Sequence, residues 1–228
     1  MARQTMRIFP LGDSALTVEF GETISIDLNQ RAIALADHFY ESGFPGFVEA
    51  VPAYASASIF YDIIAVRTAF PEFSTAFDAV SDIVRKAIGD PHQSVSNNSR
   101  LFEIPVHFNS ESALDLEVVG EVNALSTDEV IEIFISREYR VYMLGFLPGF
   151  TYMGEVDKRI ATPRRTTPRE RVPRGSVGIA GSQTGIYSLD SPGGWQIIGR
   201  TDVEIFTPND ETPTLLQPGD SVRFVREK

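Results

Sequence analysis

A chain of 228 residues with 43% hydrophobic and 22% charged residues has the composition of an ordinary globular protein with a sizeable core. The formal net charge of -11 argues against a general nucleic-acid or membrane-surface binder, and the lack of cysteine excludes disulfides and cysteine-ligated metals. No apolar run approaches the roughly 20 residues of a membrane helix, and the first residues contain no apolar signal region, so we expect a cytoplasmic protein without membrane contact.

The first 92 residues predict an α+β domain. Its expected strands are residues 6–10, 15–20, 47–52 and 56–63, of which the second pair is rich in β-branched and aromatic side chains. Apolar residues three and four apart predict a helix from Leu28 to Phe39, ended by Gly43, and a second helix over 73–87, ended by Gly89. The order β-β-α-β-β-α favours two layers, with both helices on one side of a sheet.

A domain boundary is expected between His92 and Arg100, because this segment is polar and has no periodicity. It separates an N-terminal domain (1–92) from a C-terminal domain (101–228). The second domain is predicted to open with a strand over 101–108, in which Pro105 favours an edge or bulged position.

Two short helices are expected next, each opened by a capping box: Ser112 with Asp115, and Ser126 with Glu129. A strand over 139–146 follows, and then short strands separated by Pro-Gly and Gly-Gly turns up to a last strand over 221–225. Many short strands with such turns favour a mainly β domain, a small barrel or sandwich.

The stretch from Gly145 to Thr201 differs from the rest of the chain. Glycine and proline recur in it too often for a helix, and it holds the single tryptophan, Trp195. It also contains the basic residues Lys158, Arg159, Arg164, Arg165, Arg169, Arg171 and Arg174, with only Glu170 among them. Two interpretations stay open: the arginines bind an anionic substrate or acidic partner, or they pair with nearby Asp and Glu on a solvated loop.

Several familiar sites are not expected. The glycines of residues 178–185 are followed by no lysine, so this stretch is no phosphate-binding P-loop. The three histidines have no ligand spacing, so no metal site is predicted, and His107 in an apolar strand is interpreted as structural. Because no nucleophile–base pair is recognisable, the catalytic residues stay unknown and activity of the isolated chain is not expected.

Candidate binding residues are therefore sought in the distinctive stretch. Its arginines can hold a carboxylate or phosphoryl oxygen, its hydroxyl and amide groups can bond to an amide or lactam, and its aromatic rings can wall a flat pocket. The candidate substrate-binding residues are Arg164, Arg169, Ser176, Gln183, Tyr187, Trp195 and Arg200, with Phe150 and Tyr152 as pocket wall. The alternative is that the aromatic residues form core, which is favoured for Phe150, whereas a site is favoured for Arg200, Gln183 and Trp195.

The same stretch carries a resemblance. It contains G-F-x-P-G-F-x-Y from Gly145, P-R-x-x-x-P-R-x-x-V-P-x-G-S-V, G-x-Q-T-G-I-Y, and S-P-G-G-W-x-x-I-G-R-T up to Thr201. This long pattern resembles the signature of the KipI family, also called allophanate hydrolase subunit 1 and, in bacteria, the 5-oxoprolinase B subunit. Segments at 12–16 and 51–54 extend the resemblance to nearly the whole chain. It implies that the C-terminal domain is a cyclophilin-like β-barrel.

The resemblance also implies a function. Family members are similar to one half of a carboxyltransferase-like module, whose other half is an allophanate hydrolase subunit 2-type protein. With a LamB/YcsF-type protein, the bacterial assembly hydrolyses 5-oxo-L-proline to L-glutamate using ATP, and no ATP site is located in this chain. The alternatives are an inhibitor of a sensor histidine kinase and a subunit of a urea or allophanate pathway. Relatives often carry histidine where this chain has Phe134, and a glycine-rich turn where it has residues 109–112.

Overall fold

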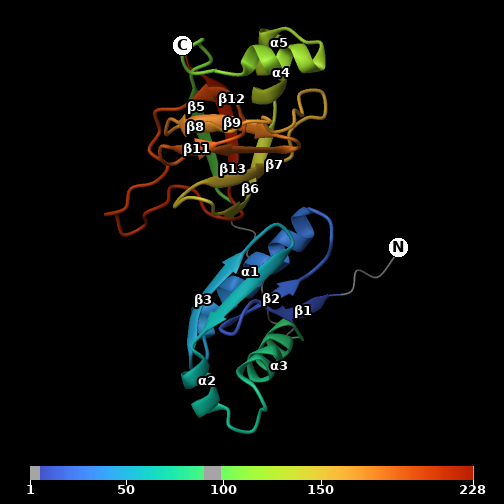
Figure 1. The fold of residues 1–228 in the computed structure, drawn as a ribbon, viewed down its shortest axis with the longest axis vertical. Helices are drawn as coiled ribbons and strands as arrows, with labels where there is room; N and C mark the ends of the chain where they lie inside the picture. The colour runs from blue at the N-terminus through green and yellow to red at the C-terminus, as the bar shows by residue number, and fades with distance from the viewer. Residues whose placement is uncertain (1–5, 90–98, 228) are drawn as a thin grey trace. The chain divides into compact units, whose positions relative to one another are not determined.

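The computed structural model describes residues 6–89 and 99–227, and contacts between Cα atoms divide the chain into two units, Met1–Asn97 and Asn98–Lys228 (Figure 1). Most of the predicted boundary segment, residues 90–98, lies outside the described residues. The chain combines helices with two main sheets, so a mixed α/β fold is confirmed.

The N-terminal unit is a four-stranded antiparallel sheet in the order β1-β2-β4-β3. Its strands are β1 (Arg7–Pro10), β2 (Ala15–Glu19), β3 (Phe47–Pro52) and β4 (Ser56–Tyr61). Strand register pairs Leu16 with Ile59 and Val18 with Ala57, so these apolar side chains point to one face. Helices α1 (Ile26–Ser42) and α3 (Ala76–Gly89) bury their apolar stripes against that face in one hydrophobic cluster.

A short helix, α2 (Ile63–Ala69), lies between β4 and α3 where the sequence predicted the end of a strand. Strand β4 stops at Tyr61 because Asp62 is a helix N-cap: its carboxylate accepts a hydrogen bond from the backbone N–H of Ala65 at 2.8 Å. The β-branched residues of this segment therefore belong to a helix despite their strand propensity.

The C-terminal unit is built on a seven-stranded sheet in the order β12-β9-β10-β7-β6-β13-β5. Its strands are β5 (Leu101–Val106), β6 (Glu138–Leu144), β7 (Thr151–Gly154), β9 (Ser176–Ala180), β10 (Gln183–Ile186), β12 (Gln196–Arg200) and β13 (Ser221–Arg226). The two end strands approach each other where His107 and Arg200 exchange backbone hydrogen bonds of 2.8 and 3.0 Å, which nearly closes the sheet into a barrel. The edge position predicted from Pro105 is confirmed, because β5 ends the sheet.

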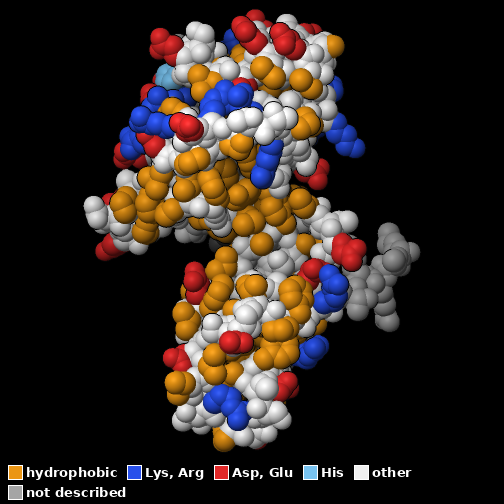
Figure 2. Space-filling view, in the orientation of Figure 1, with side chains coloured by type: hydrophobic (Ala, Val, Ile, Leu, Met, Phe, Trp, Pro, Cys, Tyr) orange, Lys and Arg blue, Asp and Glu red, His pale blue; other side chains and the backbone are white. Residues whose placement is uncertain are grey.

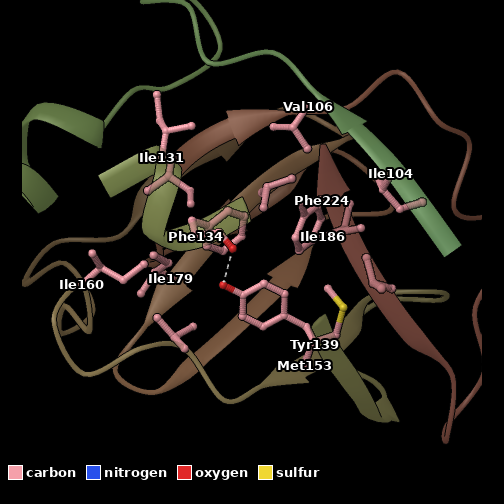
Figure 3. Close-up of a cluster of buried hydrophobic side chains, with 14 of the residues drawn as sticks. Ile104, Val106, Ile131, Phe134, Tyr139, Met153, Ile160, Ile179, Ile186 and Phe224 are labelled. Carbon is pink, nitrogen blue, oxygen red and sulfur yellow. Dashed lines mark hydrogen bonds between the residues drawn. The ribbon is translucent and has the colours of Figure 1, made fainter. Parts of the chain in front are cut away.

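The interior of this barrel is filled by large apolar side chains from all around the sheet and from α4 (Leu116–Asn123) and α5 (Thr127–Ile135) (Figure 3). Phe134 of α5 stacks on Tyr139 and Phe224, with ring centroids 5.0 and 4.9 Å away. The hydroxyl of Tyr139 donates a hydrogen bond of 2.8 Å to the Phe134 carbonyl. The apolar Phe134 is thus a core residue of this unit.

One of the two predicted capping boxes is confirmed and the other is wrong. At α5, Ser126 and Glu129 exchange the expected side-chain-to-backbone bonds. At α4 the cap position is Asp115, and its side chain makes no capping bond, because the buried carboxylate is bonded to arginines elsewhere in the unit. Ser112 lies outside the helix, and its backbone N–H donates a hydrogen bond to Oδ1 of Asn109.

A two-stranded ribbon of β8 (Arg169–Val172) and β11 (Ser191–Gly193) accompanies the sheet. The glycine-containing residues 178–185 lie mainly in the antiparallel pair β9 and β10. Strand β6 ends at Leu144, short of the predicted 146, and Phe146 has a positive φ of 67°, which no extended strand has.

Candidate functional site

Glycines on the outer face of the barrel sheet let aromatic rings lie directly on its strands. A Cβ on Gly178 would come within 3.1 Å of Trp195, and one on Gly185 within 2.5 Å of the Thr151 carbonyl and 3.0 Å of the Phe150 ring. A side chain at Gly185 would therefore collide with the neighbouring backbone, and one at Gly178 would crowd the Cβ atom of Trp195. Most of the aromatic candidates gather on this face, opposite the packed interior.

The candidate aromatic residues form a second hydrophobic cluster of the C-terminal unit, outside the barrel interior. The Phe150 ring is at its centre, in edge-to-face contact with Tyr152, Tyr187 and Trp195 at centroid distances of 4.8, 5.0 and 5.5 Å. Phe150, Tyr187 and Trp195 are buried, and Tyr152 is partly exposed. Such contacts contribute about 0.5–1.5 kcal/mol each beyond the area that they bury. The cluster is packed like core, as favoured for Phe150.

Tyr187 is enclosed by the ribbon. A Cβ on Gly193 would lie 2.4 Å from its hydroxyl oxygen, so any larger residue there would displace the phenol. Burial raises the pKa of the Tyr187 phenol, while a backbone hydrogen bond from Trp195 and the charge of Arg164 act in the opposite direction. The Tyr152 pKa is also raised by burial and lowered in part by Arg164. The field of this arginine therefore reaches both phenols.

Arg164 lies on the surface of the cluster. Its guanidinium carbon is 5.7 Å from the centre of the Trp195 ring, a cation–π contact. Within the described residues no carboxylate forms an ion pair with Arg164. It is thus a guanidinium whose charge is available to a ligand.

The neighbouring arginines are used differently. Arg165 and Arg169 both bind Asp115, which is 1% exposed and precedes α4. Five of the seven basic residues of this stretch pair with carboxylates: Arg159 with Asp157, Arg165 and Arg169 with Asp115, Arg171 with Asp190, and Arg174 with Glu204. Figure 2 shows Lys and Arg side chains gathered over the face that carries β8 and β11. The ion-pair interpretation holds for these five.

The surface ion pairs lower the pKa values of their carboxyl groups. Hydrogen bonds from the Arg174 backbone and the Arg171 side chain hold the pKa of Asp190 below its ordinary value. The Arg159 guanidinium and backbone hold the pKa of Asp157 well below its usual range. These carboxylates are therefore ionised at neutral pH and hold their arginines against the loop.

Arg200 lies apart from this group, at a pocket of about 110 Å³. The pocket is lined by Arg174, Gly175, Tyr187, Ser188, Arg200, Thr201, Asp202, Val203, Glu204, Ile205 and Phe206. The Nε atom of Arg200 is buried and meets no hydrogen-bond acceptor in the described part of the chain. A buried N–H without an acceptor is costly, so an oxyanion in this pocket would satisfy it.

Gly175 shapes the same pocket. It has a φ of +79°, and a Cβ there would lie 2.1 Å from the Thr201 carbonyl. The buried Ser176 follows it and pairs with Arg200 across β9 and β12. Gln183 is farther along the sheet: it pairs with Gly154 and shares the outer face with Gly185 and Tyr152.

The structure thus divides the predicted site residues. It brings Arg164, Trp195, Tyr187, Phe150 and Tyr152 into one cluster, with Gln183 on the same face of the sheet. Arg200 and Ser176 lie at the pocket, which Tyr187 also borders, and Arg169 is bonded to Asp115. Their binding roles stay predictions.

Two participants were not foreseen. The sequence assigned Asp115 to a helix cap, and no local pattern distinguishes a capping acid from one that binds two distant arginines. Arg174 was counted among the basic residues without a role, yet it lines the pocket beside Arg200.

In 6–89 and 99–227 no three His, Asp or Glu side chains are grouped so as to hold a metal ion. The same ranges contain no helix with the length and apolar character needed to cross a bilayer.

The family model of the carboxyltransferase domain, subdomains C and D, matches residues 6–216. The chain belongs to this family. Among its carboxyltransferase-domain relatives, the 5-oxoprolinase B subunit of Bacillus subtilis (strain 168) is 46% identical over 96% of this chain and 92% of its own length. The 5-oxoprolinase B subunit of Escherichia coli O157:H7 is 40% identical over 99% of this chain and 98% of its own. The resemblance drawn from the signature is confirmed.

A solved structure shares this fold. The crystal structure of TTHA0988 superimposes with a TM-score of 0.80 at 37% identity, over 94% of this chain. This chain spans only 39% of that one, so the larger protein contains much that is absent here.

Proposed function

We propose that this chain is the B-type subunit of an ATP-dependent 5-oxoprolinase, which opens 5-oxo-L-proline to L-glutamate. The observation that carries the proposal is the similarity, over nearly the full length of each chain, to two bacterial proteins named as the B subunit of 5-oxoprolinase. Its partners in the proposed assembly are an allophanate hydrolase subunit 2-type protein and a LamB/YcsF-type protein. The barrel of the C-terminal unit is proposed to be of the cyclophilin-like kind.

The described residues of this chain favour binding over bond cleavage. 5-Oxoproline carries one carboxylate and a lactam amide, and guanidinium groups without carboxylate partners suit the carboxylate. In the described parts of the chain Arg164 has that character, and Arg200 has a buried Nε without an acceptor, although its charge also acts on Asp190. His107 lies at the barrel seam, the place where β5 and β12 approach each other. Its Nε2 is 3.1 Å from Asp202 and 3.5 Å from Glu227, so we interpret His107 as a structural residue and not as a general base.

ATP use is assigned to the assembly. A phosphate-binding glycine loop joins a strand to a helix, so that backbone N–H groups at the helix N-terminus face the phosphates. Residues 178–185 instead run through the paired strands β9 and β10. These residues therefore do not fit a nucleotide-binding loop.

The test is reconstitution from purified subunits. Glutamate and ADP are measured for this chain, the subunit 2-type protein and the LamB/YcsF-type protein, singly, in pairs and together. We expect both products from the complete set, and no turnover when this chain is alone or omitted. Turnover by the chain alone would refute the shared assembly. An inactive complete set, with tight binding to a sensor histidine kinase, would favour the inhibitor alternative.

A further inference from the structure

Asp115 is an acid that the barrel buries and surrounds with donors. Its Oδ1 accepts hydrogen bonds from Arg165 Nη1 at 2.8 Å and Arg169 Nη2 at 2.6 Å. Its Oδ2 accepts from Arg169 Nη1 at 2.8 Å and from the backbone N–H of Ile197 at 2.7 Å. Its own N–H donates to the Ile197 carbonyl at 2.7 Å. A carboxylate that is 1% exposed is stable only with such a complete set of partners.

These bonds fix a segment distant in sequence. Asp115 joins the start of α4 to Ile197 of β12 and to Arg165 and Arg169 of the basic stretch. The backbone of the stretch is bound as well, since Arg165 N–H donates to the Gly194 carbonyl at 2.7 Å. On the other side, Gln196 Nε2 donates to the Pro163 carbonyl at 2.9 Å.

Arg164 is the residue between these anchors. Its neighbours on both sides are bonded to the barrel, whereas its own guanidinium has only the Trp195 ring beneath it among the described residues. Asp115 is fully occupied by Arg165 and Arg169, so it does not neutralise Arg164. The arrangement keeps one exposed cation at a fixed place beside Tyr152 and Tyr187.

We infer that Asp115 is a positioning residue, which holds residues 163–169 on the barrel so that Arg164 is presented to the oxyanion of a small ligand. The inference rests on the proposed function for the identity of that ligand, the carboxylate of 5-oxoproline. An arginine that is already fixed loses less side-chain freedom on binding. Asp115 with its bonds to Arg165 and Arg169, here called the clamp, therefore raises the affinity without touching the ligand. Inorganic phosphate also presents an oxyanion to an arginine, and the experiment distinguishes a carboxylate ligand from a phosphate ligand.

The first arm uses the reconstituted assembly. Asp115→Asn keeps the shape but removes the charge that orders both arginines, and should raise KM for 5-oxoproline about tenfold with kcat within about twofold. Arg164→Ala should raise KM at least as much. In the double variant the two effects should not add, because Asp115 acts through Arg164. Additive effects would overturn the inference. Inorganic phosphate should compete weakly; competition as strong as that of the product glutamate would assign Arg164 to a phosphoryl group.

The second arm uses the chain alone and needs no activity. Trypsin cleaves after arginine, so the rate of cleavage at Arg164 reports how firmly the segment is held. We expect faster cleavage in Asp115→Asn and an altered emission of Trp195, the single tryptophan. Asp190→Asn, which releases the surface residue Arg171, is the matched control and should leave both readouts unchanged.

The two arms separate the two hypotheses. If the assembly with the unmodified chain is inactive, the proposed function is refuted. Faster cleavage at Arg164 in Asp115→Asn would still support the clamp in that case. Unchanged cleavage would overturn the clamp. If Asp115→Asn does not fold, Arg169→Lys replaces it, because lysine keeps the charge but makes one of the two bonds. Normal KM and normal cleavage in that variant would also overturn the inference.

Discussion

At the residue scale, Arg200, which lines the pocket, is predicted to bind an anion. Its Nε is buried in the pocket wall without an acceptor in the described residues, so an anion bound there would gain a charge-assisted hydrogen bond. Arg200→Ala should weaken binding of the anionic ligand by about 1.5–3 kcal/mol, the range for a hydrogen bond to a charged group. Calorimetry on the complete assembly measures it.

The control for Arg200 is Arg171→Ala. Arg171 has a side chain 77% exposed and pairs with Asp190 on the surface, so its loss should leave the affinity unchanged. Equal affinity in the Arg200 variant and the unmodified chain would return Arg200 to a structural role at the barrel seam.

Tyr139 gives a prediction of pH dependence at the residue scale. Burial raises the pKa of its phenol, whose hydroxyl donates to the Phe134 carbonyl. An unfolded tyrosine titrates near pH 10, whereas the folded one keeps its proton to higher pH. Above about pH 10 the unfolded state therefore binds fewer protons, and the free energy of unfolding falls as pH rises, by up to about 1.4 kcal/mol per pH unit for this group.

Tyr139→Phe tests this dependence. At neutral pH the variant should lose about 1 kcal/mol, because one internal hydrogen bond is removed. Between about pH 10 and 11 its urea unfolding free energy should fall less steeply than that of the unmodified chain. Tyr40→Phe, at a residue 60% exposed, is the control. Parallel curves for both variants would show that Tyr139 does not contribute to alkaline unfolding.

The binding roles of the residues selected from the signature stay predictions, but the structure shows where these residues lie. Glycine, arginine and aromatic positions are visible in the sequence, and most of the selected residues gather at the outer cluster and the pocket. The sequence did not predict which arginines would be neutralised. Asp115 is 50 residues from Arg165 and 54 from Arg169, and only the folded barrel brings them together. Ion pairs across such separations leave no local pattern.

At the scale of elements, the two proposed caps differ in a way that mutation can measure. Ser126→Ala removes the side-chain acceptor of the Glu129 N–H at the start of α5, and should cost about 1 kcal/mol of unfolding free energy. Ser112→Ala is the matched control, because Ser112 caps no helix, and should change stability by less than about 0.5 kcal/mol. Urea unfolding of both variants compares them directly. Equal costs would contradict the assignment of the cap to Ser126 alone.

Elements were predicted well where the local pattern and the tertiary environment agree. Period-two alternation and turn residues identified most strands, and β5 ends the sheet as Pro105 indicated. Disagreement arose at α2, because the sequence predicted a strand up to Ile63, whereas the strand ends before Asp62, the N-cap of the helix. It arose again at Phe146, whose left-handed backbone ends the extended chain after β6. Both errors lie where one residue changes the backbone direction.

At the scale of the molecule, the C-terminal unit has its own core, its own nearly closed sheet and a stabilising link at its start. Arg100 binds Asp220, which is 3% exposed, through hydrogen bonds of 2.9 and 2.5 Å. The Arg100 carbonyl also accepts from the Ser221 N–H. A fragment must therefore include Arg100 to keep a buried carboxylate paired, although the sequence placed the start of the domain at residue 101.

We predict that residues 99–228 fold alone and unfold in one cooperative thermal transition. A fragment of residues 101–228 should be less stable by about 1–3 kcal/mol, because Asp220 stays buried while its arginine is missing. Arg100→Met in the longer fragment should reproduce most of that loss, since it removes the charge and keeps the chain length. Calorimetry of the three fragments gives the order of their Tm values. An aggregated 99–228 fragment, or equal Tm values for all three, would contradict an independent unit that depends on this link.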